Sequence, residues 1–243
     1  MNGEKNTPRL LGAMFLVVVV TSLAGGLLLA SVTGGAFASA SISTILVDIA
    51  DRVALVRASI VADLATSVGE IALAALLYVV LRNQSRVVAL VALGCWLGEA
   101  LSLALSKVGV VALISLSQEY IRAGAPMNSF YQTLGDFLYT GITMRLGATT
   151  QMFFYCVGGL LWYGLFFRSR YIPRVIPLFG LAAVSVALVG ILLEFLGFSV
   201  SSYVYLPILP FELTIGGWLL LRGITGEESR RAAAIGSRAV PST

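Results

Sequence analysis

Six continuous apolar runs constrain the fold of this chain more than any other feature. A helix rises about 1.5 Å per residue, so roughly 20 apolar residues cross a hydrocarbon core about 30 Å thick. The runs are Leu10–Val32, Val53–Leu81, Val87–Leu116, Leu146–Phe167, Val175–Phe198 and Tyr203–Leu221. They do not alternate with polar residues, which disfavours barrel strands. The sequence therefore predicts an all-α, polytopic membrane bundle of six transmembrane helices.

The composition supports this prediction and excludes several kinds of chemistry. Of the 243 residues, 58% are hydrophobic and 12% charged, whereas charged residues make up about 25% of soluble domains. The chain has no His and two Cys, which excludes His-ligated haem and zinc, four-Cys iron–sulfur clusters and imidazole-based triads. We expect no metal and no cofactor. Cys95 and Cys156 lie inside apolar runs, where Cys behaves as a small buried residue.

The distribution of Lys and Arg predicts the orientation in the membrane, because short cytoplasmic loops carry the excess of positive charge. With the N-terminus inside, five of the sixteen basic residues fall in outer segments: Arg52, Arg57, Lys107, Arg122 and Arg145. The other eleven are Lys5, Arg9, Arg82, Arg86, Arg168, Arg170, Arg174, Arg222, Arg230, Arg231 and Arg238. We expect both termini to be cytoplasmic. The net charge of +4 reflects topology. The sequence shows no basic face with interleaved aromatic residues, so we expect no binding of nucleic acid.

The two ends of the chain call for separate interpretations. Residues 1–224 are predicted to form one six-helix transmembrane domain, and residues 225–243, which are polar, small and basic, a flexible cytoplasmic tail. Lys5 and Arg9 precede the first run and Ala36-Phe37-Ala38 follows it, a pattern typical of a cleaved secretory signal. The run is longer than the usual core of a signal peptide, which favours a retained helix.

Two outer connections are longer than turns and carry apolar residues at helical spacing. In the first connection these are Ile42, Ile45, Leu46 and Ile49, and in the second, after Pro126, they are Phe130, Leu134, Phe137 and Leu138. We predict a short interfacial helix in each. Such helices either lie at the level of the lipid headgroups or cover the outer mouth of a cavity.

Five acidic residues inside the apolar runs are the strongest functional signal: Asp63, Glu70, Glu99, Glu194 and Glu212. An Asp at the centre of a membrane helix costs about 2.5–3.5 kcal/mol on insertion scales, and such residues normally face the bundle interior or water. From the helical rise, Glu70 and Glu99 lie about 16 and 18 Å from the inner ends of their helices. Asp63 and Glu212 lie about 15 and 13 Å from the outer ends.

The heights predict that four of these acids meet near the middle of the bilayer. Asp63 and Glu70 are seven residues apart and share one helical face, whereas Glu194 lies near the outer boundary, where water solvates it. Carboxyl groups crowded in a poorly hydrated space repel one another, and a proton is readily shared between them. Alternatively, the acids are paired with Arg57, Lys107 or helix hydroxyls and only hold helices together.

Two further features surround these acids. Pro207 and Pro210 remove two backbone donors from the sixth run and predict a kink just before Glu212. Aromatic residues directed inward would form a wall suited to an apolar or cationic guest. The candidates are Tyr78, Trp96, Phe153, Phe154, Tyr155, Trp162, Tyr163, Tyr205, Phe211 and Trp218.

Several short motifs carry a family resemblance. They are Arg57, Ala62-Asp63, Leu76-Leu77-Tyr78, Leu81-Arg82, Glu99-Ala100, the loop Arg168-Ser169-Arg170-Tyr171-Ile172-Pro173-Arg174, Glu212, Trp218-Leu219-Leu220 and Gly223. From about Arg9 to Ile224 the chain resembles the bacterial membrane proteins grouped as domain of unknown function 4386. Arg170 stands where that family tends to have Gly. The resemblance implies a six-helix bacterial plasma-membrane protein and no established activity.

The leading functional hypothesis is an intramembrane site that binds or transports a small amphipathic or cationic molecule. Asp63, Glu70, Glu99 and Glu212 would carry protons or act as counter-ions, with Arg57 as an electrostatic partner on the outer side. The bilayer and a small hydrophobic or cationic ligand are the expected partners, and the sequence leaves open whether copies of the chain associate.

Two alternatives stay open at this stage. The first is a membrane-embedded enzyme in which Asp63 or Glu212 acts as general acid on a lipid or isoprenoid substrate. Pro210-Phe211-Glu212 faintly resembles the Pro-x-Glu segment of small multi-helix membrane cyclases, although Leu213 replaces the second acid usual there. The second alternative is an accessory membrane subunit that recognises a partner through its helix faces.

Overall fold

The computed structural model describes residues 7–34 and 40–224, and the regular structure in those ranges is helical. The elements are α1 (Thr7–Thr33), α2 (Ile42–Asp51), α3 (Val53–Leu81), α4 (Arg86–Arg122), α5 (Phe130–Asp136), the π-helix η1 (Phe137–Thr149), α6 (Thr150–Ser169), α7 (Val175–Phe195), the 3-10 turn η2 (Ser202–Tyr205) and α8 (Ile208–Arg222). The predicted cytoplasmic tail and the Ala36-Phe37-Ala38 motif lie outside the described residues.

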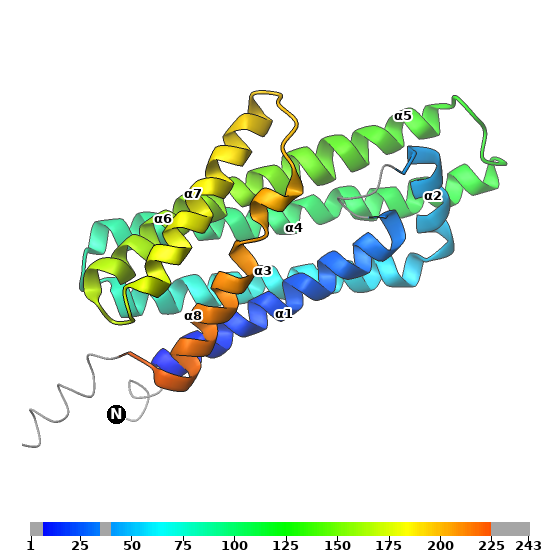
Figure 1. The fold of residues 1–243 in the computed structure, drawn as a ribbon. Helices are drawn as coiled ribbons and strands as arrows, with labels where there is room; N and C mark the ends of the chain where they lie inside the picture. Colours follow the sequence, from blue (N-terminus) through cyan, green and yellow to red (C-terminus); the bar gives the residue numbers. More distant parts are fainter. Residues whose placement is uncertain (1–6, 35–39, 225–243) are drawn as a thin grey trace, which may run out of the picture.

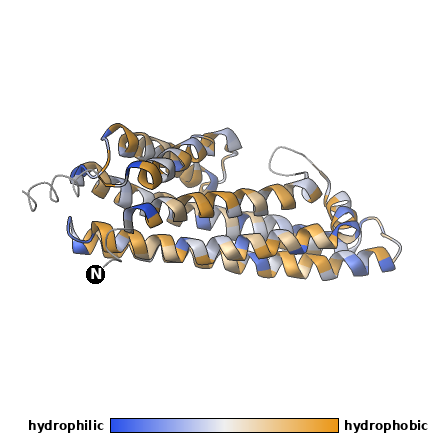
Figure 2. Ribbon diagram, turned by 90° about the horizontal axis from the view of Figure 1, so that it is seen from below, coloured by the Kyte–Doolittle hydropathy of each residue, from blue (hydrophilic) through white to orange (hydrophobic). Residues whose placement is uncertain are grey.

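Within these ranges, six helical segments are long and apolar enough to cross a membrane. They are α1, α3, α4, the continuous α5–η1–α6, α7 and η2–α8. The prediction of an all-α, six-helix membrane bundle is confirmed. Hydrophobic residues cover most of the length of the long helices (Figure 2). Many of their large side chains point outward, such as Val61 and Val68 on α3, each 68% exposed.

Four long helices lie side by side and form an elongated bundle (Figure 1). Helix α3 packs between α1 and α4, and α4 packs on α6. Helix α7 covers α6 and α8 covers α1, so that α7 and α8 lie toward one end of the bundle, called here the α8 end (Figure 1). The short helices α2 and α5 lie at the opposite end, called here the α2 end (Figure 1).

The two short helices predicted from the sequence behave differently. Helix α2 buries Ile45, Leu46 and Ile49, three of the four apolar residues expected on its inner side. Helix α5 runs directly through η1 into α6, so the fourth span begins at Phe130 rather than at Leu146. Polar residues interrupt the apolar pattern over this stretch, but η1 packs on α4, with Gly109 facing Ile142 and Thr143.

A buried polar layer separates two apolar cores. The core at the α2 end includes Val56 on α3 and Val110 on α4. The core at the α8 end includes Leu73 on α3 and Trp96 on α4. Between these limits lie buried polar and charged residues on both helices. They are Ser59, Asp63, Thr66, Ser67, Glu70, Glu99, Ser106 and Lys107. The fold therefore concentrates ionisable groups at mid-length, where desolvation is strongest.

Candidate functional site

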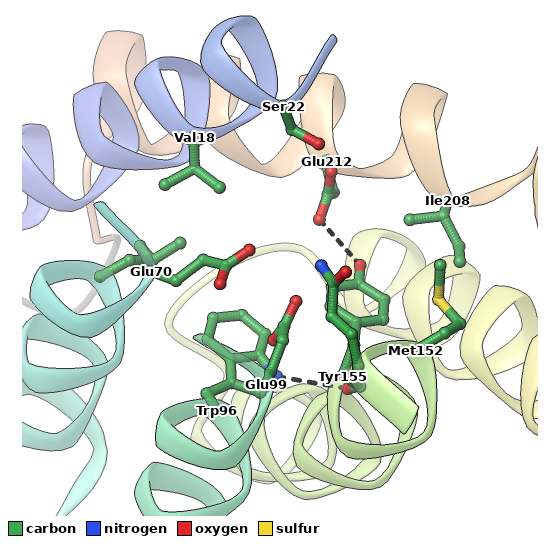
Figure 3. Close-up of a pocket in the computed structure, with 11 residues that line it drawn as sticks. Val18, Ser22, Glu70, Trp96, Glu99, Met152, Tyr155, Ile208 and Glu212 are labelled. Atoms are coloured by element: carbon green, nitrogen blue, oxygen red, sulfur yellow. Dashed lines mark hydrogen bonds between the residues drawn. The ribbon is translucent and has the colours of Figure 1, made fainter. Parts of the chain in front are cut away.

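A cavity of about 120 Å³ lies at the α8-end side of this polar layer. A single water needs about 10–15 Å³ on the same measure, so the space holds several waters or a small molecule. Five helices contribute its lining (Figure 3). The lining residues are Val18, Ser22, Glu70, Leu73, Trp96, Glu99, Gln151, Met152, Tyr155, Ile208 and Glu212.

Glu70 on α3 and Glu99 on α4 form a pair of buried carboxyl groups. They are 5% and 4% exposed, and their carboxyl groups point toward one another (Figure 3). Gln151 lines the cavity with them, and Oε2 of Glu70 is buried without a hydrogen-bond partner. The cavity therefore contains an acceptor that the described part of the protein does not satisfy.

Glu212 on α8 supplies the third carboxyl group of the cavity. The hydroxyl of Tyr155 donates a hydrogen bond to Glu212 Oε1 over 2.8 Å and lies 3.3 Å from the hydroxyl of Tyr163. Helix α8 starts at Ile208, so Pro210 lies in its first turn, where a missing backbone donor has little effect. The prolines therefore mark the beginning of α8 rather than the predicted kink inside it.

Trp96 and Tyr155 form an aromatic wall. Their rings stack with centroids 5.9 Å apart and planes inclined by 8°, and Trp96 Nε1 donates to the backbone oxygen of Tyr155 over 3.2 Å. Gly158, one turn along α6, makes this possible, because a Cβ there would overlap the indole of Trp96. The stacked rings and this hydrogen bond join α4 to α6 at the cavity.

The structure places Asp63 and Arg57 apart from the other three predicted site residues. Lys107 Nζ lies 2.7 Å from Asp63 Oδ2, with side chains that are 9% and 10% exposed. Asp63 shares a face of α3 with Glu70, but seven residues of helix separate the two by about 10 Å. Arg57 is exposed and lines a different hollow on the surface. The cation that contacts Asp63 is thus Lys107 rather than Arg57.

Glu194 also lies outside the cavity. It accepts hydrogen bonds from Tyr205 over 2.8 Å and from Thr149 over 3.5 Å, and it is only partly exposed. Glu194 is thus partly exposed and also bound by two hydroxyl donors, which agrees with the alternative that the acids pair with helix hydroxyls.

Sequence reasoning missed Ser22 and Gln151 as lining residues. Their signal was weak, since each is a single neutral polar residue inside an apolar stretch. Ser22 is exposed, and Gln151, Met152 and Glu212 are partly exposed, so the cavity opens on the side of the bundle formed by α1, α6 and α8. The lining contains three carboxyl groups and no basic side chain, which makes the site acidic.

The chain matches a known protein family. A family model with the description Domain of unknown function (DUF4386) matches residues 10–223, a range that contains all the motifs quoted above. Among curated proteins and among solved structures, none matches the chain.

Proposed function

We propose that this chain, which belongs to the family described as Domain of unknown function (DUF4386), binds a small cation in the Glu70–Glu99–Glu212 cavity and exchanges it for protons. The family description names no activity, so the proposal depends on the chemistry of the cavity itself.

The observation that carries the proposal is the convergence of three carboxyl groups without a basic side chain among the lining residues. Carboxylates removed from water and close to one another must be neutralised by protons or by a bound cation. A cation that enters therefore displaces protons, and protonation expels the cation. The indole of Trp96 and the ring of Tyr155 add a surface that attracts cations.

The size and chemistry of the cavity favour this function over the enzyme alternative. A lipid or isoprenoid substrate needs a large, mainly apolar chamber, whereas the cavity measures about 120 Å³ and presents Glu70, Glu99, Glu212 and Gln151. The open side at Ser22 faces outward from the bundle, which supports entry of a small amphipathic cation from the side.

The position of the cavity along the bundle supports exchange across a membrane. On α3, Arg57 and Arg82 flank Glu70 at 13 and 12 residues, about 20 and 18 Å of helical rise. Both distances fall in the headgroup region, which lies about 15–22 Å from the middle of a bilayer. In our proposal the protein lies in a bacterial plasma membrane, with both termini cytoplasmic and the α2 end outside.

A binding experiment with proton counting tests the proposal. Purified protein in weakly buffered detergent solution is titrated with guanidinium or with tetramethylammonium, and released protons are followed with a pH dye. We expect proton release on binding, and weaker binding at acidic pH because protons compete for the carboxylates. The Glu99→Gln variant should lose both signals, and Glu194→Gln, an acid outside the cavity, should keep them. Absence of binding by both probes, or binding without proton release, would overturn the proposal.

A further inference from the structure

A second hollow lies on the surface between α3 and α4. It shares no lining residue with the carboxylate cavity and does not require cation binding there. Its volume is about 370 Å³. The lining residues are Arg57, Ile60, Val61, Val111, Ile114 and Ser115. One cationic side chain therefore stands at an otherwise largely apolar recess.

At this recess, the described part of the chain provides no acidic partner for Arg57. Lys107 is paired with Asp63, Arg122 with Glu119, and Arg52 donates to the backbone oxygen of Ser31. Arg57 is exposed, and none of the described residues forms an ion pair with it at 4 Å or less. The recess also presents no acidic side chain. It is therefore complementary to an anion.

The depth of Arg57 indicates which anion meets it. If Glu70 marks the middle of the bilayer, Arg57 lies about 20 Å away along α3, within the headgroup region that extends to about 20–22 Å. From there toward the middle, exposed apolar side chains continue along both helices. Val61 and Val68 on α3 and Leu105 and Val108 on α4 are each 67% or 68% exposed.

We propose that this recess binds one anionic phospholipid, with its phosphate on the guanidinium of Arg57 and an acyl chain along the α3–α4 surface. Guanidinium forms paired hydrogen bonds with phosphate oxygens, and basic recesses between membrane helices bind anionic headgroups. Because the recess supplies a cation and no anion, a net negative headgroup is favoured over a zwitterionic one.

Native mass spectrometry of the full chain with added phosphatidylglycerol tests this site. The Arg57→Gln variant is compared with Arg145→Gln, which removes the same charge from an exposed position on η1. Wild type and Arg145→Gln should retain one phosphatidylglycerol, and Arg57→Gln should bind it about tenfold more weakly, the effect of losing one charge-assisted hydrogen-bonded contact. An equal loss in both variants, or no loss in Arg57→Gln, would overturn the proposal.

A second variant separates the recess from charge alone. Val111→Trp fills the recess and leaves Arg57 in place. We expect it to lose the bound phosphatidylglycerol as Arg57→Gln does. Retention of the lipid would show that the lipid does not occupy the recess, which would overturn the proposal. Phosphatidylcholine serves as the zwitterionic comparison, and equal retention of phosphatidylcholine by the wild type would contradict the choice of an anionic headgroup.

Discussion

Tyr155 donates its hydroxyl hydrogen bond to Glu212 over 2.8 Å, and this contact joins α6 to the beginning of α8 at the cavity. The same tyrosine stacks on Trp96, so one residue connects the aromatic wall to the third carboxyl group. The hydroxyl thus holds Glu212 Oε1 in place at the cavity, and a hydrogen bond to a charged group is stronger than one between neutral groups.

Replacing Tyr155 by Phe should therefore weaken cation binding without disturbing the wall. A hydrogen bond to a charged group contributes about 1.5–3 kcal/mol, so the affinity for guanidinium or tetramethylammonium should fall roughly tenfold or more. The matched control is Tyr205→Phe, which removes the equivalent donor from Glu194 outside the cavity. Calorimetric titration of the two variants checks this, and similar affinities for both would count against the role of Tyr155.

The buried pair of Lys107 and Asp63 should be required for stability. Removing one partner of a buried ion pair leaves an uncompensated charge and destabilises a protein by about 3–5 kcal/mol. We expect Lys107→Met to lower the unfolding temperature in mild detergent strongly, and the double variant Asp63→Asn with Lys107→Met to recover most of that loss. A double variant as unstable as the single one would show that the pair is not the cause.

Gly25 should tolerate no side chain, because a Cβ there would overlap Oδ1 of Asp63, and the ion pair between Asp63 Oδ2 and Lys107 keeps this carboxylate in place. We expect Gly25→Ala to destabilise the protein by about 1–3 kcal/mol, as overpacking does. The neighbouring Gly26 meets nothing within 4 Å, so Gly26→Ala should be neutral or slightly stabilising. Thermal unfolding of the two variants decides the matter, and equal unfolding temperatures would disagree with this packing.

Gly158 offers a test of the aromatic wall. A Cβ at this position would overlap the indole of Trp96, so Gly158→Ala should displace Trp96 from Tyr155 and weaken cation binding. Gly164 lies further along α6 with nothing within 4 Å, and Gly164→Ala is the control. Binding titrations are the measurement, with tryptophan fluorescence as a second readout. Unchanged affinity and fluorescence in Gly158→Ala would exclude the wall from the site.

Much of the architecture follows from the sequence, whereas the pairing of charges does not. The lengths of the apolar runs indicate which helices cross the membrane, and the helical rise places Glu70, Glu99 and Glu212 at similar heights in it. Which cation reaches Asp63 depends on the rotation of α4 against α3, so Lys107, 44 residues along the chain, was no more evident than Arg57. The continuity of α5, η1 and α6 was equally hidden, because packing on α4 compensates for the polar residues that interrupt the apolar pattern.

The most direct test of the central claim is flux through the Glu70–Glu99–Glu212 cavity in proteoliposomes. A pH gradient is imposed, and uptake of tetramethylammonium is measured for the wild type, Glu99→Gln and Glu194→Gln, with equal protein in each preparation. The account predicts gradient-dependent uptake by the wild type and by Glu194→Gln, and none by Glu99→Gln. Uptake by Glu99→Gln equal to that of the wild type, or uptake that ignores the gradient, would contradict it.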